Sequence, residues 1–267
     1  MDRKKVLKAA LLQFDVQLGN PAANRIKAAK MLTLAVRQGA KLIALPELWT
    51  TGYALNRLAE LTEVETANSS LEFLQQVAQQ QKLWIFAGSM LEKSEGAFYN
   101  TSYIIRDDGV IAGKFRKVHL FSLMEEEKYF SAGDGICIVD TPFGKAATMI
   151  CYDLRFPELA RKLAAQGVVL TVVPAEWPHS RQEHWKILNQ ARAIENQNFV
   201  LAVNRVGVSE NTHFCGNSMI IDPWGKILAQ GGEEEAVIIA ELDLSQVEQV
   251  RNTIPCWRDR RPDVYNA

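Results

Sequence analysis

The chain has 267 residues, of which 48% are apolar and 23% charged, with 30 Lys and Arg against 31 Asp and Glu. This composition is typical of a globular protein with a substantial core and argues against disorder. The formal net charge of -1 also argues against nucleic acid or a membrane surface as a partner, because proteins that bind either one usually have an excess of basic residues.

The N-terminal segment and the cysteine spacing favour a reducing, cytoplasmic location. The charged start, residues 1–8, is followed by a short apolar stretch that Gln13 interrupts, which fits neither a signal peptide nor a membrane span. No CxxC pair occurs among the four widely spaced cysteines, so a disulfide framework is not expected. These are Cys137, Cys151, Cys215 and Cys256.

The first half of the chain predicts alternating strands and helices. Asn20 and Pro21 supply an N-cap and a first-turn proline for the first helix. Apolar periodicity predicts strands over 8–14, 41–45 and 83–87, helices over 21–39 and 70–81, and a hairpin over 99–117 that turns at 107–109.

The second half continues the alternation. The pattern predicts strands over 146–150, 168–173, 199–203 and 236–242, helices over 156–167 and 181–196, a hairpin turning at 222–225, and a polar surface tail from about residue 251. No linker or fixed-period repeat divides the sequence, so we expect a single domain over 1–267. Buried strand–helix units mixed with hairpins indicate an α/β protein with mixed sheets.

Cys151 stands where one predicted strand ends and, after a short turn, a helix begins. Side chains at such junctions project from the carboxyl edge of a sheet, where α/β proteins place their sites. The helix N-terminus would lower the pKa of the thiol and could stabilise an oxyanion. Cys151 is therefore a candidate nucleophile, with a packed core cysteine as the alternative. We expect the other three cysteines to be core residues.

A cysteine nucleophile needs a base. None of the four histidines lies in a Cys-His signature, and no HExxH spacing indicates a metal site. A partly buried carboxylate could serve, because desolvation raises its pKa toward neutrality. Glu47 follows the apolar strand over 41–45 and points to the same sheet edge as Cys151. The alternative for Glu47 is a turn residue in solvent.

The segment 113–121 contains three cations. Lys114 and Arg116 fit a solvated face. In a pleated strand Lys117 points opposite to Arg116 and shares a face with Phe115 and His119, so Lys117 is the candidate for an inward ammonium. Such a group can depress the pKa of a thiol and stabilise an oxyanion.

Three segments together resemble the signatures of the nitrilase superfamily of carbon–nitrogen hydrolases. They are Leu-Pro-Glu47, Phe-Arg-Lys117-Val-His-Leu-Phe and Ile-Cys151-Tyr-Asp-Leu-Arg-Phe-Pro-Glu, in which Lys117 comes 70 positions after Glu47 and Cys151 comes 34 positions after Lys117. The resemblance implies an α-β-β-α sandwich with two stacked mixed sheets, a Glu47–Lys117–Cys151 triad, no cofactor or metal, and a homodimer forming an eight-layer assembly.

The family also has a second active-site glutamate, for which Glu125, Glu126 and Glu127 are candidates. Glu126 matches best when counted back from Gly133. Phe115 stands where many members have tyrosine. The segments 49–53, 176–178, 191–197 and 222–225 most resemble the omega-amidase-type branch, which removes ammonia from 2-oxo acids such as 2-oxoglutaramate or its methylthio analogue.

The resemblance implies a thioester mechanism. Glu47 takes the thiol proton, Cys151 attacks the amide carbonyl, and Lys117 with the backbone N–H of Tyr152 holds the oxyanion. Ammonia leaves with a proton from Glu47, which then activates water. Glu126 orients Lys117 or the substrate.

The substrate pocket is less defined by sequence. Arg155 could bind a substrate carboxylate through two hydrogen bonds, or could lock the turn after Cys151. Trp49, Tyr53 and Trp177 could form pocket walls, or belong to the core. Alternatives with the same triad are an N-carbamoyl amine amidohydrolase, a small aliphatic amidase or a nitrilase. An alternative of another class is a catalytically silent interaction module.

Overall fold

The structure, a computed structural model, describes residues 6–62 and 69–265. Residues 1–5, which begin the charged N-terminal segment, lie outside the described residues. Within the described ranges, no helix is long and apolar enough to cross a membrane.

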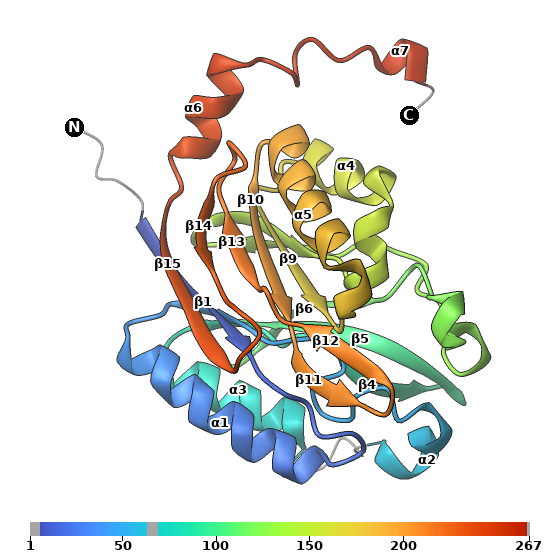
Figure 1. The fold of residues 1–267 in the computed structure, drawn as a ribbon. Helices are drawn as coiled ribbons and strands as arrows, with labels where there is room; N and C mark the ends of the chain where they lie inside the picture. The colour runs from blue at the N-terminus through green and yellow to red at the C-terminus, as the bar shows by residue number, and fades with distance from the viewer. Residues whose placement is uncertain (1–5, 63–68, 266–267) are drawn as a thin grey trace.

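Two mixed sheets stack face to face (Figure 1). The first has the order β15-β1-β2-β3-β5-β4, with β6 beside β5, and the second has the order β14-β13-β10-β9-β8-β7. The strands of the first sheet are β1 (Val6–Gln13), β2 (Leu42–Ala44), β3 (Trp84–Phe86), β4 (Met90–Ser94), β5 (Ala97–Ile105), β6 (Ile111–Arg116) and β15 (Ala236–Asp243). Those of the second are β7 (Ile138–Thr141), β8 (Gly144–Thr148), β9 (Leu170–Ala175), β10 (Phe199–Asn204), β13 (Met219–Ile221) and β14 (Ile227–Gln230).

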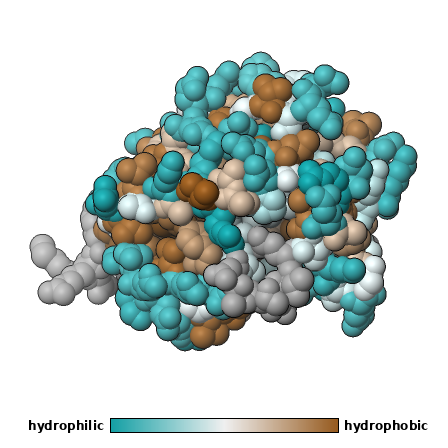
Figure 2. Space-filling model, turned by 90° about the horizontal axis from the view of Figure 1, so that it is seen from below, coloured by the Kyte–Doolittle hydropathy of each residue, from teal (hydrophilic) through white to brown (hydrophobic). Residues whose placement is uncertain are grey.

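Helices cover the outer face of each sheet. The first sheet is covered by α1 (Pro21–Arg37) and α3 (Ser70–Gln81), and the second by α4 (Pro157–Ala165) and α5 (Gln182–Asn196) (Figure 1). Seen from below, hydrophilic residues make up much of the molecular surface, with hydrophobic residues interspersed (Figure 2). The predicted α-β-β-α sandwich is confirmed.

The helix starts follow the sequence signals. The Asn20 side chain accepts a hydrogen bond from the Ala23 N–H at 3.1 Å, and Pro21 occupies the first turn of α1. The Ser69 side chain caps α3 in the same way. Both satisfy backbone donors that a helix N-terminus otherwise leaves unpaired.

Several elements escaped the sequence prediction because they are short or lack a clear period. They are β4, β7, the ribbon of β11 (Val206–Ser209) and β12 (Thr212–Cys215), and the helices α2 (Leu58–Leu61), α6 (Gln246–Thr253) and α7 (Pro262–Tyr265). The tail lies on the surface as expected, although α6 reaches into it. Cys137 and Cys215 are buried, but Cys256 is exposed in this tail, so the expectation of a core residue is wrong there.

Each sheet has a parallel centre, β1-β2-β3 in one and β10-β9-β8 in the other. Glu47 follows β2, Cys151 follows β8 and Glu176 follows β9 directly. The Glu176 N–H donates to Glu47 Oε2 at 2.9 Å and so joins the strand ends of the two sheets. The carboxyl edges of both sheets therefore supply one site.

The Glu47 turn rests against the loop between β3 and β4. Gly88 in that loop has φ +61°, and a Cβ there would overlap the Pro46 carbonyl oxygen and lie 2.7 Å from that of Leu45. Ser89 then donates its N–H to the Pro46 carbonyl at 3.1 Å and accepts the Leu48 N–H on Oγ at 2.9 Å. Glycine at 88 thus permits the close approach that holds the Glu47 turn.

We predict that Gly88→Ala lowers the free energy of unfolding by about 3 kcal/mol or more, because left-handed strain and a backbone clash add. Urea unfolding measures the change. Gly96→Ala is the matched control: φ is +82°, but nothing lies within 4 Å of its Cβ position. It should lose only about 1 kcal/mol. Equal losses in the two variants would contradict the importance of the close approach.

Candidate active site

A buried lysine lies between two buried glutamates. Lys117 Nζ is 2.8 Å from Glu47 Oε1 and 2.7 Å from Glu126 Oε1, and none of the three side chains is exposed. Lys117 comes directly after β6, and its inward direction agrees with the alternation expected from the sequence. The arrangement is a charged cluster without solvent contact.

Glu47 is fixed by four hydrogen bonds. Its Oε1 accepts from Lys117, from the Tyr53 hydroxyl and from Asn100 Nδ2, each at 2.8 Å, while Oε2 accepts from the Glu176 N–H. Asn100 in β5 was not found by sequence reasoning. The only sequence signal for Asn100 is that an amide residue stands within a predicted hairpin strand. In the structure, Asn100 and all later residues of β5 are buried.

The structure distinguishes the three adjacent glutamates. Glu126 Oε1 accepts from Lys117 and competes with Glu47 Oε1 for the single proton of the Tyr53 hydroxyl, and Oε2 accepts from the Phe121 N–H at 2.9 Å. Glu125 is exposed and pairs with Lys128. Glu127 is exposed as well. Glu126 is therefore the glutamate that meets Lys117.

Cys151 is the first residue of the 3₁₀ turn η4 (Cys151–Arg155), which follows β8, and its φ is +46°. This conformation is uncommon for a residue with a side chain and often marks a functional site. Asp153 braces it: Oδ2 accepts the Ile150 N–H at 3.0 Å and Oδ1 accepts the His119 N–H at 2.9 Å. The His119 ring stacks on Phe156 at 3.6 Å. Asp153 thus ties the Cys151 turn to the segment that follows Lys117.

The charges of the cluster reverse what burial alone would do. Burial would raise the pKa of Glu47, but the Lys117 ammonium and the Glu176 N–H hold that pKa below its ordinary value. Burial would likewise lower the pKa of Lys117, but Glu126 and Glu47 hold it well above the ordinary value. The expectation that the pKa of Glu47 rises toward neutrality is therefore wrong, because the sequence did not show these partners.

The thiol is protonated in the resting site. Burial, reinforced by the Glu47 carboxylate, raises the pKa of Cys151 well above its ordinary value. The expectation that a helix N-terminus lowers this pKa is wrong. The residues after Cys151 form the short turn η4, and α4 begins only at Pro157. The site thus holds a thiol beside a carboxylate that can accept its proton.

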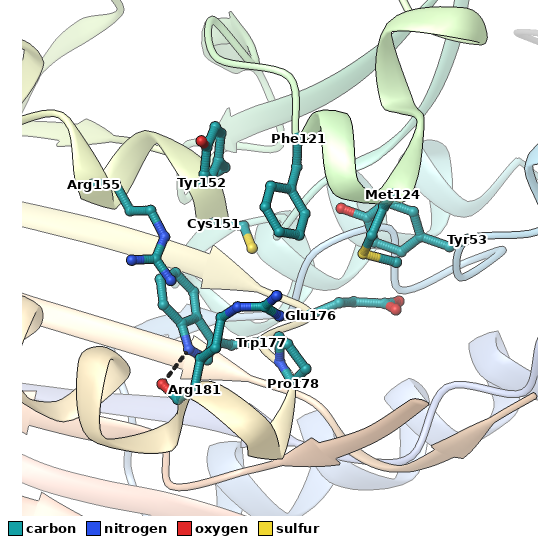
Figure 3. A pocket seen from close by; sticks show the side chains of 10 residues that line it. All are labelled: Tyr53, Phe121, Met124, Cys151, Tyr152, Arg155, Glu176, Trp177, Pro178 and Arg181. Carbon is teal, nitrogen blue, oxygen red and sulfur yellow. Dashed lines mark hydrogen bonds between the residues drawn. The ribbon is translucent and has the colours of Figure 1, made fainter. Parts of the chain in front are cut away.

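A small pocket opens beside Cys151 (Figure 3). It is lined by Tyr53, Phe121, Met124, Cys151, Tyr152, Arg155, Glu176, Trp177, Pro178 and Arg181. Two of the predicted wall residues, Tyr53 and Trp177, line it, and so does Arg155, the candidate for binding a substrate carboxylate. Trp49 does not: it is fully buried in the core, and its Nε1 donates to the Ala87 carbonyl at 2.9 Å. That prediction is wrong because the turn after Glu47 directs Trp49 inward.

The pocket wall also contains residues that sequence reasoning missed. Phe121 ends the Lys117 segment and Pro178 ends the segment 176–178, whereas Met124 and Arg181 carried no pattern of their own. Across residues 6–62 and 69–265, no group of three or more His, Cys, Asp or Glu side chains is arranged to hold a metal ion.

Comparison with known proteins identifies the family. A model of the carbon–nitrogen hydrolase family matches residues 8–252. The chain belongs to the carbon–nitrogen hydrolase family. The family prediction made from the three motifs is confirmed, and these motifs lie on the strand ends and turns that surround the pocket.

Individual carbon–nitrogen hydrolases agree over nearly the whole chain. The 2-oxoglutaramate amidase of Bacillus subtilis is 44% identical and covers 95% of this chain and 97% of its own. Omega-amidase NIT2 of Homo sapiens is 32% identical, covering 96% and 95%. The crystal structure of Saccharomyces cerevisiae Nit3, a nitrilase-superfamily member, matches with a TM-score of 0.89 at 33% identity, covering 96% and 97%.

Glu176 is a third buried carboxyl at the site. Its Oε2 accepts from Arg205 Nη1 at 3.2 Å, while Oε1 has no hydrogen-bond partner among the described residues. Burial raises the pKa of Glu176 to about 7. Because the folded state then holds this proton to higher pH than the unfolded chain, its contribution to stability falls as pH rises from about 4.5 to 7.

We predict that Glu176→Gln removes this pH dependence. Glutamine does not titrate, so the free energy of unfolding of the wild type relative to the variant should fall by about 2 kcal/mol between about pH 5.5 and about pH 8. Urea unfolding at the two pH values measures it. A difference that stays constant with pH would contradict the raised pKa.

Glu92→Gln is the matched control. Glu92 is also buried, but hydrogen bonds from Arg116, Lys114 and Thr101 overcome burial and lower its pKa to about 2. It is ionised in both folded and unfolded states over this pH interval. Its substitution should therefore change stability by the same amount at both pH values.

Proposed function

We propose that this protein hydrolyses the terminal amide of a small 2-oxo acid, such as 2-oxoglutaramate, through a thioester on Cys151, and releases ammonia. The observation that carries the proposal is the Lys117 ammonium held between Glu47 and Glu126 at the pocket that contains Cys151. The 44% identity to a 2-oxoglutaramate amidase supports the substrate class.

In the first half of the reaction, the Glu47 carboxylate accepts the thiol proton as Cys151 Sγ bonds to the amide carbon. The carbonyl oxygen becomes an oxyanion, held by the Lys117 ammonium and the Tyr152 N–H. When the carbonyl re-forms, the C–N bond breaks and Glu47 gives its proton to the leaving nitrogen. Ammonia departs and a thioester remains.

In the second half, Glu47 takes a proton from a water molecule, whose oxygen bonds to the thioester carbon. The same two donors hold the second oxyanion. Its collapse breaks the C–S bond and releases the acid, and the thiolate recovers the proton from Glu47. The site returns to its resting thiol and carboxylate.

Lys117 acts through its positive charge. Its pKa, held well above the ordinary value by Glu126 and Glu47 against the effect of burial, keeps it an ammonium throughout. Glu126 and the Tyr53 hydroxyl are positioning residues, since both contact the Lys117–Glu47 pair from the side. The homodimer, the cytoplasmic location and the single domain stay predictions of the sequence.

We predict that Cys151→Ser reduces ammonia release by about 1,000-fold or more, because a serine hydroxyl beside Glu47 is a far weaker nucleophile. Cys256→Ser, at an exposed cysteine, is the matched control and should keep normal turnover. Intact-protein mass spectrometry after a brief substrate pulse should detect an acyl adduct on the wild type alone. Normal turnover by Cys151→Ser would exclude the thioester mechanism.

We predict that a substrate panel separates the alternatives with the same triad. The highest kcat/KM for ammonia release should belong to 2-oxoglutaramate or its methylthio analogue, ahead of glutamine, an N-carbamoyl amine and a nitrile. Carbon dioxide released together with ammonia would favour the carbamoyl activity. Absence of both turnover and adduct with every compound would favour the silent interaction module.

A further inference from the structure

Two arginines from separate turns lie on the wall of the Cys151 pocket. Arg155 belongs to η4, and Arg181 to the 3₁₀ turn η5 (His179–Arg181) before α5. Neither guanidinium forms an ion pair with a carboxylate in the described part of the chain. The third charged residue of the wall, Glu176, is paired with Arg205. The pocket thus has positive charge that the protein does not neutralise.

The Arg155 guanidinium is held by the protein. It lies 4.7 Å from the centre of the Trp177 ring (Figure 3). Its Nη1 is 3.3 Å from His184 Nδ1. Burial lowers the pKa of Arg155, and the positive charge of Arg181 lowers it further. The positive charges of the two arginines therefore repel each other, and an anion bound between them would reduce this repulsion.

Arg181 has a fixed backbone and a free guanidinium. Its N–H donates to the Pro178 carbonyl at 3.1 Å, and its carbonyl accepts from Trp177 Nε1 at 2.8 Å, the dashed line in Figure 3. The guanidinium lies 5.6 Å from the centre of the Phe121 ring, and no hydrogen bond joins it to the residues described. A planar group with five free donors is suited to bind a carboxylate through two hydrogen bonds.

We propose that Arg181 selects the substrate, its guanidinium binding the carboxylate of the 2-oxo acid while Arg155, stacked on Trp177, supplies the second positive charge. This inference rests on the proposed function and assigns its specificity to a residue outside the three family motifs. Phe121, Met124 and Pro178 provide the apolar wall along which the methylene groups of a short chain would lie.

Arg181 also borders a second, more open pocket. That pocket shares Phe121, Met124 and Pro178 with the first and continues to His179 and His213. Arg181 thus stands where the two pockets meet. An anionic substrate that passes through the open pocket would encounter Arg181 before it reached Cys151.

The test compares two amides that differ at one end: 2-oxoglutaramate, and 4-oxopentanamide, in which a methyl group replaces the carboxylate. Arg181→Gln should lower kcat/KM for 2-oxoglutaramate by about 10-fold to 100-fold, mainly through KM, since a charge-assisted hydrogen bond is lost. It should change kcat/KM for 4-oxopentanamide by less than about 3-fold. Arg181→Lys should recover part of the loss, because it restores charge but not the two-point geometry.

A binding measurement makes the test independent of turnover. The product 2-oxoglutarate should bind Cys151→Ser more tightly than the double variant Cys151→Ser, Arg181→Gln, by a similar factor in Kd. Arg106 is an exposed arginine that pairs with Asp108, and Arg106→Gln is the matched control. This variant should leave kcat/KM unchanged for both amides.

The outcomes separate the two proposals. Equal losses for both amides, or an unchanged Kd for 2-oxoglutarate, would overturn the role of Arg181 and leave the proposed function standing. If the wild type hydrolyses 4-oxopentanamide but not 2-oxoglutaramate, the proposed substrate class fails, and the inference fails with it.

Discussion

The Lys117 ammonium lies between the carboxylates of Glu47 and Glu126, and solvent reaches none of the three. Removing charges from water is costly, and such a cluster persists only if its remaining hydrogen-bonding positions are filled. The protein fills them with the Tyr53 hydroxyl, the Asn100 amide and the backbone N–H groups of Glu176 and Phe121. Much of the surrounding structure is therefore arranged to solvate one buried charge cluster.

The architecture makes this possible because both sheets end at the same place. Glu47 comes from the first sheet, while Cys151 and Glu176 come from the second, and a backbone hydrogen bond joins Glu176 to Glu47. Asp153 adds a link between the Cys151 turn and the segment after Lys117. The contacts that hold the two sheets together therefore also hold the site residues together.

The cluster also determines the resting state of the nucleophile. Burial together with the Glu47 carboxylate raises the pKa of Cys151, while Lys117 and the Glu176 N–H overcome burial and lower the pKa of Glu47. The free site therefore favours thiol over thiolate. In the proposed mechanism, proton transfer becomes favourable only when a substrate carbonyl can accept the sulfur and the ammonium can hold the oxyanion, which limits unproductive chemistry at the cysteine.

The sequence by itself determined the helices and strands of the core, the strand-end positions of Glu47 and Cys151, and the inward direction of Lys117, since these follow from local periodicity. Only the tertiary structure distinguishes Glu126 from its two neighbouring glutamates, because the geometry of the turn buries Glu126 and leaves the other two exposed. It also placed Trp49 in the core but Trp177 at the pocket, and it brought in Asn100 and Arg181 from segments with no local signal. The directions of the pKa shifts likewise depend on through-space partners, which a linear sequence does not reveal.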